Sequence, residues 1–526
     1  MLYSGSELTA SICYYSFYSH LFVLMKAGLH KAPSARGRSS GKNYPYIIQK
    51  FGGESVDETE KVFAMLEHDE GGKKAAVVSA FSKVTDSLFA ILKVRKNEKI
   101  EGGDFDVVID RSLSRLKAAS EALAARIRAE IVSVVGEVVN EVNQLPDESG
   151  VTREDLVIGL GERIAARVVA AHCNLLDNNQ SKYVAVDLSD IAHGQAEVAP
   201  GDTNWQPKFF SVIKPRLVAR IQPLIAAGQI PVITGYMGRL PGGTMKVMDR
   251  GYSDSTLMLI ADALTATLST EQRVRADICK TVIGVLSADP KAFDSKTVRV
   301  RKGQKLTDDY QPSLREFLTK RTVARLAATG MKAVNAVAAD ILEKASNVDA
   351  LVRHTFHPRS TRFTAVLDRL PSSAPAGLKV IAHKAQHRLL IQNTSQLNQT
   401  GWIAKLLDVI ATEQVSVNVV DSTDNTCTIL VDKDPNKLEK IKHALQLLGN
   451  ITELSTVGWI TCAEDGNRDI DDSNSDFQRA LGELYRNRVK VIRSAATAGR
   501  EITLMVPEKY MVHAVRYLHQ TVISRS

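Results

Sequence analysis

The amino-acid sequence predicts an α/β protein: an αβα sandwich around a central, mostly parallel sheet, followed by two ferredoxin-like βαββαβ modules. Three observations support this prediction. From Tyr44 onward, apolar runs of strand length alternate with amphipathic helical stretches, which is typical of a parallel sheet covered on both faces. Near Leu370 the composition changes to the run PSSAPAG, which predicts a linker. Beyond it, one order of strands and helices occurs twice, which indicates an internal repeat.

The first predicted domain covers residues 43–369. Each expected strand is a short apolar run bounded by glycine or polar residues. A long stretch at 108–143, rich in Ala, Leu, Arg and Glu, predicts helices along one side of the domain. The expected strands lie at 44–51, 75–81, 183–187 and 229–236.

The second half of the chain is expected to contain a linker and two modules of similar size. In both modules, apolar residues recur at helical spacing, which core packing explains without a ligand. Fold logic alone favours ligand-gated regulation and dimerisation equally. The expected boundaries are 370–379 for the linker, 380–453 for the first module and 454–526 for the second.

Bulk composition excludes several classes of protein. With 526 residues, 44% hydrophobic and 24% charged, the chain can form two or three domains with their own cores. The net charge of +8 arises from 67 basic and 59 acidic residues that are interspersed, so we expect no nucleic-acid partner. Five widely spaced cysteines without a CxxC pair indicate reduced intracellular thiols. The sequence contains no Cys/His cluster, so we expect no metal site formed by such a cluster.

Residues 1–42 differ from the rest of the chain. They contain a single acid, Glu7, an apolar run at 12–25 and then the basic, Ser-rich stretch HKAPSARGRSSGK. Transit peptides share this bias, so we expect a targeting or disordered segment; a degenerate signal and a misassigned start codon stay open. The apolar run is short for a membrane span of ~20 residues, and no membrane partner is expected. The expected location is intracellular: cytoplasmic, or plastid or mitochondrial if 1–42 is a transit peptide.

The sharpest local motif is KFGGESV, which begins at Lys50. A lysine closes a strand and two glycines turn the chain. Glycine lets backbone N–H groups approach a phosphate closely, and an ammonium group neutralises phosphoryl oxygens during transfer. The motif therefore predicts a phosphate site at the end of the first strand.

KFGGESV resembles the KFGGTSV opening of aspartate kinases, and further family motifs follow in order along nearly all of residues 44–522. The resemblance implies an amino-acid-kinase-like domain followed by two ACT modules. It also implies ATP-dependent phosphorylation of the L-aspartate side-chain carboxylate to 4-phospho-L-aspartate, the first step towards lysine, threonine and methionine. ATP and Mg²⁺ are the implied cofactors. A carboxylate with a pKa of ~3.9 is already ionised and needs no general base, so positioning and charge neutralisation would supply the catalysis.

Three segments carry the implied catalytic and substrate residues. VSAFSKVTDSL resembles a substrate segment of the family, GER in IGLGERIAARVV resembles its GER or GEL helix start, and GRLPGGTMKVMDRGYSDSTLMLIADAL resembles its GRGxSDxTAALxA block. The resemblance implies that Glu162 binds the amino group of aspartate and that Arg250 binds its α-carboxylate. The implied catalytic residues are Lys50 and Asp254, and the implied substrate-binding residues are Ser79, Thr85, Glu162 and Arg250.

Nucleotide binding is implied by ICKTVIGVLSADPK, which is similar to W(K/T)DVxGIYTxDPR, and by GMK, which is similar to the start of GxKVLHP. Several positions depart from the family: Glu54 replaces Thr, Thr281 an acid, Leu286 an aromatic residue, and Asn335 and Ala336 a His-Pro pair, whereas Lys291 replaces arginine and keeps its charge. The implied nucleotide-binding residues are Gly52, Gly53, Ser55, Ser253, Lys280, Thr281, Leu286, Lys291 and Lys332.

Residues 381–420 resemble the first ACT module of the family. The resemblance implies an amino-acid effector, lysine or threonine, held by loops 394–401 and 421–425, and a homodimer or higher homo-oligomer. The implied allosteric residues are Ser395, Asn398, Gly401, Asn418, Ser422 and Thr423. Two alternatives stay open: a catalytically degenerate regulatory or binding subunit of the same fold, and another acyl-phosphate kinase such as a glutamate or N-acetylglutamate kinase.

Overall fold

The computed structural model divides the chain into two compact units, 1–43 and 44–526. All described residues belong to the second unit, so the expected segment 1–42 lies outside them. The described residues are 44–68, 71–96, 98–116, 119–145, 153–178, 181–192, 205–238, 240, 243–244, 248, 251–293, 311–372, 374, 378–393, 401–413, 415–423, 425–464, 471–497 and 501–523.

An eight-stranded sheet with the order β3-β4-β2-β1-β5-β7-β8-β6 forms the centre of the first domain. Neighbours from β3 to β7 pair in parallel, β7 and β8 are antiparallel, and β6 pairs in parallel with β8. The expected mostly parallel sheet is therefore confirmed. Its strands are β1 (Tyr46–Phe51), β2 (Lys73–Val78), β3 (Tyr183–Val186), β4 (Ile230–Thr234), β5 (Val274–Lys280), β6 (Phe317–Thr319), β7 (Val348–His354) and β8 (Phe363–Leu367).

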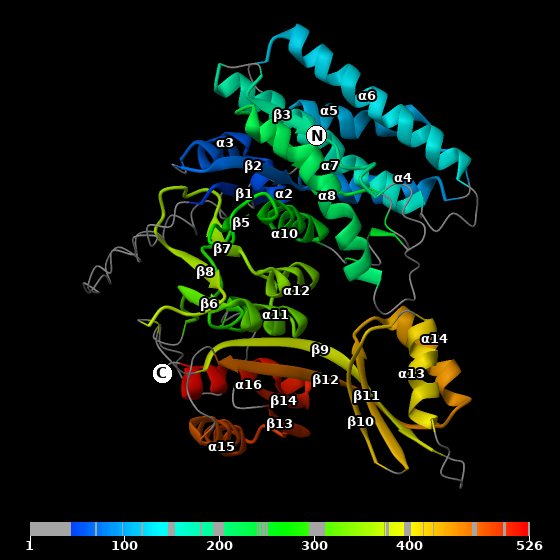
Figure 1. Ribbon diagram of the computed structural model, residues 1–526. Coiled ribbons are helices and arrows are strands. Elements are labelled where there is room, and N and C mark those ends of the chain that lie inside the picture. The colour runs from blue at the N-terminus through cyan, green and yellow to red at the C-terminus, as the bar shows by residue number, and fades with distance from the viewer. Residues whose placement is uncertain are drawn as a thin grey trace, which may run out of the picture. The chain divides into compact units, whose positions relative to one another are not determined.

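Helices cover both faces of this sheet because successive strand residues point to opposite sides. Ile48 and Val77 pack into one core, whereas Phe51 and Val78 pack into another. In Figure 1, α5 and α6 lie on one side of the sheet and α10 and α12 on the other. The helices are α2 (Gly53–Val56), α3 (Thr59–His68), α4 (Val84–Val94), α5 (Asp106–Leu113), α6 (Glu121–Gln144), α7 (Arg153–Leu176), α8 (Trp205–Ala226), α10 (Tyr252–Thr265), α11 (Lys320–Ala328) and α12 (Ala336–Lys344).

The C-terminal part forms one antiparallel sheet with the order β10-β11-β9-β12-β14-β13. Its helices divide it into two ferredoxin-like modules, with α13 and α14 on the first and α15 and α16 on the second (Figure 1). The elements are β9 (Leu378–Gln392), α13 (Trp402–Thr412), β10 (Val417–Ser422), β11 (Thr426–Asp432), α14 (Pro435–Gln446), β12 (Asn450–Glu464), α15 (Asp471–Arg486), β13 (Arg493–Thr497), β14 (Glu501–Pro507) and α16 (Met511–Leu518).

The two modules share their central strands. β9 and β12 each span 15 residues and pair along nearly their whole length. The first half of β9 supplies the fourth strand of the second module, although it precedes the first module in the chain. The boundary expected between residues 453 and 454 falls inside β12, and the expected linker 370–379 reaches the start of β9. Sequence order cannot reveal such an exchange, because it does not specify which strand fills an open sheet edge.

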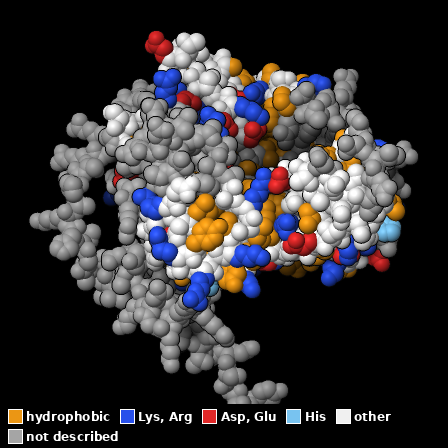
Figure 2. All heavy atoms as spheres, turned by 90° about the horizontal axis from the view of Figure 1, so that it is seen from below, with side chains coloured by type: hydrophobic (Ala, Val, Ile, Leu, Met, Phe, Trp, Pro, Cys, Tyr) orange, Lys and Arg blue, Asp and Glu red, His pale blue; other side chains and the backbone are white. Residues whose placement is uncertain are grey.

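Contacts between β9 and the first domain place the antiparallel sheet beside the eight-stranded sheet. Val380 and Ala382 of β9 pack into the same core as Leu326 of α11. On the face shown in Figure 2, basic side chains are scattered among apolar and neutral ones and form no single continuous patch. Within the described part of the chain, no helix is both long enough and apolar enough to cross a membrane.

Candidate active site

Lys50 and Asp254 form a buried ion pair at the carboxyl end of β1. Lys50 Nζ lies 2.7 Å from Asp254 Oδ1, and the two side chains are 5% and 2% exposed. Lys50 is the penultimate residue of β1, and Gly52 and Gly53 then turn the chain into α2. A Cβ on Gly53 would lie 2.8 Å from the carbonyl oxygen of Ala80, so the turn needs glycine to pack against the segment after β2.

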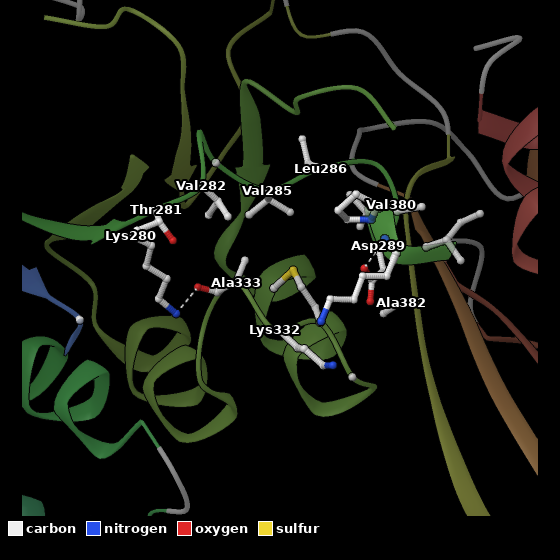
Figure 3. A pocket seen from close by; sticks show the side chains of 18 of the residues that line it. Lys280, Thr281, Val282, Val285, Leu286, Asp289, Lys332, Ala333, Val380 and Ala382 are labelled. Carbon is white, nitrogen blue, oxygen red and sulfur yellow. Dashed lines mark hydrogen bonds between the residues drawn. The ribbon is translucent and has the colours of Figure 1, made fainter. Parts of the chain in front are cut away.

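Asp254 lies in the first turn of α10, which follows Gly251 at φ +93°. Its Oδ2 accepts a 3.2 Å hydrogen bond from Lys280 Nζ, which also donates to the carbonyl of Ala333 at 2.7 Å (Figure 3). Burial raises the pKa of Asp254, but the ammonium groups of Lys50 and Lys280 outweigh it and hold the pKa below its usual value. Two lysines around one carboxylate leave an excess positive charge, which favours an additional anion.

Glu162 lies on α7 near the same lysine. The side chain is 4% exposed, and burial raises its pKa to about 8, although Lys50, the backbone of Tyr236 and Ala80, and the Tyr252 side chain act in the opposite direction. A Cβ on the adjacent Gly161 would lie 2.8 Å from Ala80 Cβ, so α7 approaches the end of β2 closely. A buried carboxyl group with this pKa is suited to receive a cationic group.

The predicted substrate residues are only partly brought together. The hydroxyl oxygens of Ser79 and Ser253 are 2.8 Å apart, which joins the end of β2 to the start of α10. Thr85 lies half-buried in the first turn of α4. Arg250 lies outside the described residues.

A cavity of about 410 Å³ opens beside Lys280, the lysine that donates to Asp254 (Figure 3). Lys280 and Thr281 lie on one side of it and Val380 and Ala382 on the opposite side, with Lys332 between them. The apolar part of its wall suits a nucleotide base and the lysines suit phosphates. Every predicted nucleotide residue except Ser253 lines this cavity: Gly52, Gly53, Ser55, Lys280, Thr281, Leu286, Lys291 and Lys332.

Three of the positions that depart from the family motifs, Glu54, Thr281 and Asn335, have hydrogen-bond partners in the structure. Thr281 Oγ1 donates a 3.0 Å hydrogen bond to Glu54 Oε2. Asn335 caps α12, where its Oδ1 accepts hydrogen bonds of 2.9 and 3.1 Å from the backbone N–H groups of Val337 and Ala338. Asn335 therefore has a structural role that its residue type readily fills.

Thr355 is a site residue that sequence reasoning missed. It is fully buried, its Oγ1 lies 2.7 Å from Ser55 Oγ, and its N–H donates to the carbonyl of Lys280 at 2.9 Å. Thr355 directly follows β7, in the run RHTFHP that begins at Arg353. Because the carboxyl ends of parallel strands meet at one edge of a sheet, the position of Thr355 after a strand could have indicated that it belongs to the site.

The described effector candidates lie on the first module. Gly401, at φ +86°, precedes α13, and the Thr423 hydroxyl lies 2.7 Å from that of Thr426 beyond Ser422, the last residue of β10. Asn418 Oδ1 accepts a 2.9 Å hydrogen bond from Lys384 Nζ. Ser395 and Asn398 lie outside the described residues. In the described ranges, no group of three or more His, Cys, Asp or Glu side chains could hold a metal ion.

A model of the amino acid kinase family matches residues 45–354. The chain belongs to the amino acid kinase family. The expected resemblance to aspartate kinases is confirmed by curated relatives. An aspartokinase from Schizosaccharomyces pombe is 28% identical over 262 residues, which is 47% of each chain. An aspartate kinase from Gibberella moniliformis is 20% identical and aligns with 93% of this chain and 99% of its own. Aspartokinase 3, chloroplastic, from Arabidopsis thaliana is 23% identical over 90% of this chain and 80% of its own.

Solved structures confirm the fold of this amino acid kinase. Escherichia coli aspartokinase III in complex with aspartate and ADP has a TM-score of 0.66 and 18% identity, covering 90% of this chain and 99% of that chain. The same enzyme in complex with lysine and aspartate has a TM-score of 0.62 and 17% identity over the same shares of each chain.

Proposed function

We propose that this protein is an aspartate kinase, which transfers the γ-phosphoryl group of ATP to the side-chain carboxylate of L-aspartate. The observation that carries the proposal is the Lys50–Asp254–Lys280 cluster, which adjoins the 410 Å³ cavity and lies near Glu162. The names of the relatives and the aspartate and ADP bound by the Escherichia coli enzyme support the same substrates.

In the proposed complex, the nucleotide occupies the cavity. Its base packs against apolar residues such as Val285 and Val380, and its phosphates lie near Lys280, Lys332 and the Gly52–Gly53 turn. A glycine turn and a helix N-terminus such as that of α10 favour phosphate because backbone N–H groups and the helix dipole point towards it. Lys291 and Ser55 complete the polar part of the wall.

L-aspartate binds on the other side of the cluster. Ionised Glu162 accepts its ammonium group, Ser79 and Thr85 contact it from the segment after β2, and Arg250 binds its α-carboxylate. A planar guanidinium is suited to a bidentate carboxylate contact. The side-chain carboxylate then faces the phosphates across Lys50.

During transfer, an aspartate side-chain oxygen forms a bond to the γ-phosphorus while the bond to the β–γ bridging oxygen breaks, and that oxygen leaves as part of ADP. No proton has to be removed because the attacking carboxylate is ionised. Lys50 and Lys280 offset the repulsion between the two anions. Mg²⁺ usually binds through one or two carboxylates plus substrate phosphates, so Asp254 is the protein group that fits it. The bound ion would neutralise phosphate charge.

The C-terminal modules extend the proposal to regulation. We infer that the first module binds lysine or threonine near Gly401, Asn418 and Ser422, and that the protein acts as a homodimer or higher homo-oligomer in the first step towards lysine, threonine and methionine. The lysine complex of the Escherichia coli enzyme supports an amino-acid effector. The chloroplastic relatives favour an organellar location if residues 1–42 are a transit peptide.

The test is an assay of the full chain with ATP, Mg²⁺ and L-aspartate, in which hydroxylamine traps the acyl phosphate. We expect aspartate-dependent hydroxamate that is lost in Lys50→Met. Hydroxamate formed only with L-glutamate or N-acetyl-L-glutamate would assign a different acyl-phosphate kinase. Nucleotide binding without hydroxamate from any acceptor would favour a regulatory subunit of the same fold.

A further inference from the structure

The regulatory sheet forms part of the proposed nucleotide cavity. Val380, Ile381, Ala382 and His383 of β9 line the cavity together with the Gly52–Gly53 turn. The N–H of Ile381 donates a 2.8 Å hydrogen bond to the carbonyl of Ser287, which fixes β9 against the loop after β5. A nucleotide in the cavity would therefore contact the regulatory sheet directly.

His383 is the polar side chain that β9 brings to this cavity. It also lines an adjoining cavity of about 590 Å³ that is bordered by Asp254 and Lys280. Its Nδ1 is buried and has no hydrogen-bond partner within the described structure. Buried polar atoms are nearly always paired. The side chain as a whole is partly exposed at the cavity wall, so a rotation of the imidazole would bring this atom to a polar group of a bound ligand.

The next residue connects the same strand to the first module. Lys384 Nζ donates hydrogen bonds of 2.9 Å to Asn418 Oδ1 and 3.1 Å to Asp432 Oδ1, and Asn418 Nδ2 donates to the same Asp432 oxygen at 2.9 Å. This triangle links β9, β10 and β11. β11 pairs with β9 from Gln386 to Gln392, and β12 pairs with β9 at His383. A displacement of β10 or β11 would therefore reach His383 along β9 and through the Lys384 side chain.

We propose that His383 binds the ribose or base of the nucleotide from the regulatory sheet, and that Lys384, through Asn418 and Asp432, is a positioning residue for it. The inference rests on the proposed function and deepens it. The inference predicts that changes in the first module alter the affinity of the active site for the nucleotide. They should leave aspartate binding unchanged, because the aspartate-side residues Glu162 and Ser79 lie on other elements.

The experiment measures ADP binding to the full chain by titration calorimetry, together with the KM for aspartate. His383→Ala removes one hydrogen bond, so we expect about tenfold weaker ADP binding with little change in the KM for aspartate. His383→Asn, whose amide occupies nearly the position of Nδ1, should recover part of the affinity. Lys384→Met should weaken ADP binding several-fold, whereas Lys433→Met, which removes the exposed ion pair with Glu508 on the same sheet, should not.

ADP affinity within twofold of wild type in folded His383→Ala would overturn the inference. If that variant fails to fold, His383→Gln, which moves the polar atoms, and Lys384→Met provide the test. Wild-type ADP affinity in both of these variants would also overturn the inference. Failure of the proposed function looks different, because the wild-type protein itself would then bind no ADP or phosphorylate no aspartate.

Discussion

Thr281 Oγ1 donates a 3.0 Å hydrogen bond to Glu54 Oε2 and so joins the loop after β5 to the turn after β1. Both residues depart from the aspartate kinase motifs, which have threonine in place of Glu54 and an acid in place of Thr281. The two positions therefore carry the same kinds of side chain in exchanged places, and in this structure they form a hydroxyl–carboxylate pair. This exchange explains why two departures that look damaging separately are compatible with an intact phosphate turn.

The exchange predicts a rescue. Thr281→Asp would place two carboxylates beside each other at the cavity, and we expect at least a tenfold loss of ADP affinity from the repulsion between like charges. The double variant Glu54→Thr/Thr281→Asp restores the pair in the family orientation and should return to within a few-fold of wild type. Titration calorimetry of Thr281→Asp, Glu54→Thr and the double variant gives the coupling free energy. Equal losses in the single and double variants would show that the two positions act independently.

Lys50 should be essential for turnover. Lys50→Met keeps most of the side-chain volume but leaves Asp254 with Lys280 as its cationic partner, and we expect kcat to fall by at least about 100-fold because charge neutralisation at the transferring group is lost. Hydroxamate formation measures the effect. Lys344→Met, at an exposed i,i+4 pair with Asp340, is the control and should leave kcat unchanged. Undiminished turnover in Lys50→Met would remove the proposed mechanism.

The pKa of Glu162 predicts how aspartate binding depends on pH. Since burial raises this pKa to about 8, the carboxyl group is mostly protonated below pH 8 and must ionise to receive the ammonium group of aspartate. The KM for aspartate should therefore fall by about tenfold from pH 6 to pH 7 and by about fivefold from pH 7 to pH 8. Glu162→Gln should bind aspartate weakly with a flat profile. A KM that does not change with pH in the wild-type protein would contradict this role.

The same pKa makes a separate prediction for stability. Its folded-state value lies above the ordinary value of 4.5, so the folded protein binds an extra proton across this window. The contribution of Glu162 to stability is thus present below pH 4.5 and is lost as the pH rises towards 8. Thermal unfolding should show Glu162→Gln gaining stability relative to wild type over that range. A constant difference between the two proteins would count against the raised pKa.

Two helical glycines should respond oppositely to alanine. At Gly161 an added Cβ would lie 2.8 Å from Ala80 Cβ and 3.3 Å from Val84 Cγ1, whereas at Gly136 in α6 it meets nothing within 4 Å. Gly161→Ala should lower the free energy of unfolding by about 1–3 kcal/mol through overpacking. Gly136→Ala should raise it by about 0.4–1 kcal/mol because alanine favours the helix. Chemical denaturation measures both, and the same sign for both would refute the packing argument.

Much of the fold followed from local pattern. The strands at 44–51, 75–81, 183–187 and 229–236 formed within a few residues of their expected bounds, because buried parallel strands are short apolar runs that end at glycine or polar residues. The two modules were likewise recognisable from their repeated order of elements. The nucleotide candidates converge because most of them lie at or near strand ends, where parallel strands place neighbouring residues together.

The sequence by itself determined the sheet, the helices that cover it and the residue types that gather at its edge, because each depends on periodicity and turn chemistry over a few neighbouring residues. Only the tertiary structure decided which distant residues meet. Thr281 with Glu54, Thr355 with Ser55, and His383 with the cavity are pairings across long stretches of chain. Such contacts depend on strand order and on β9 completing a module that follows it, and a linear pattern carries no information on either.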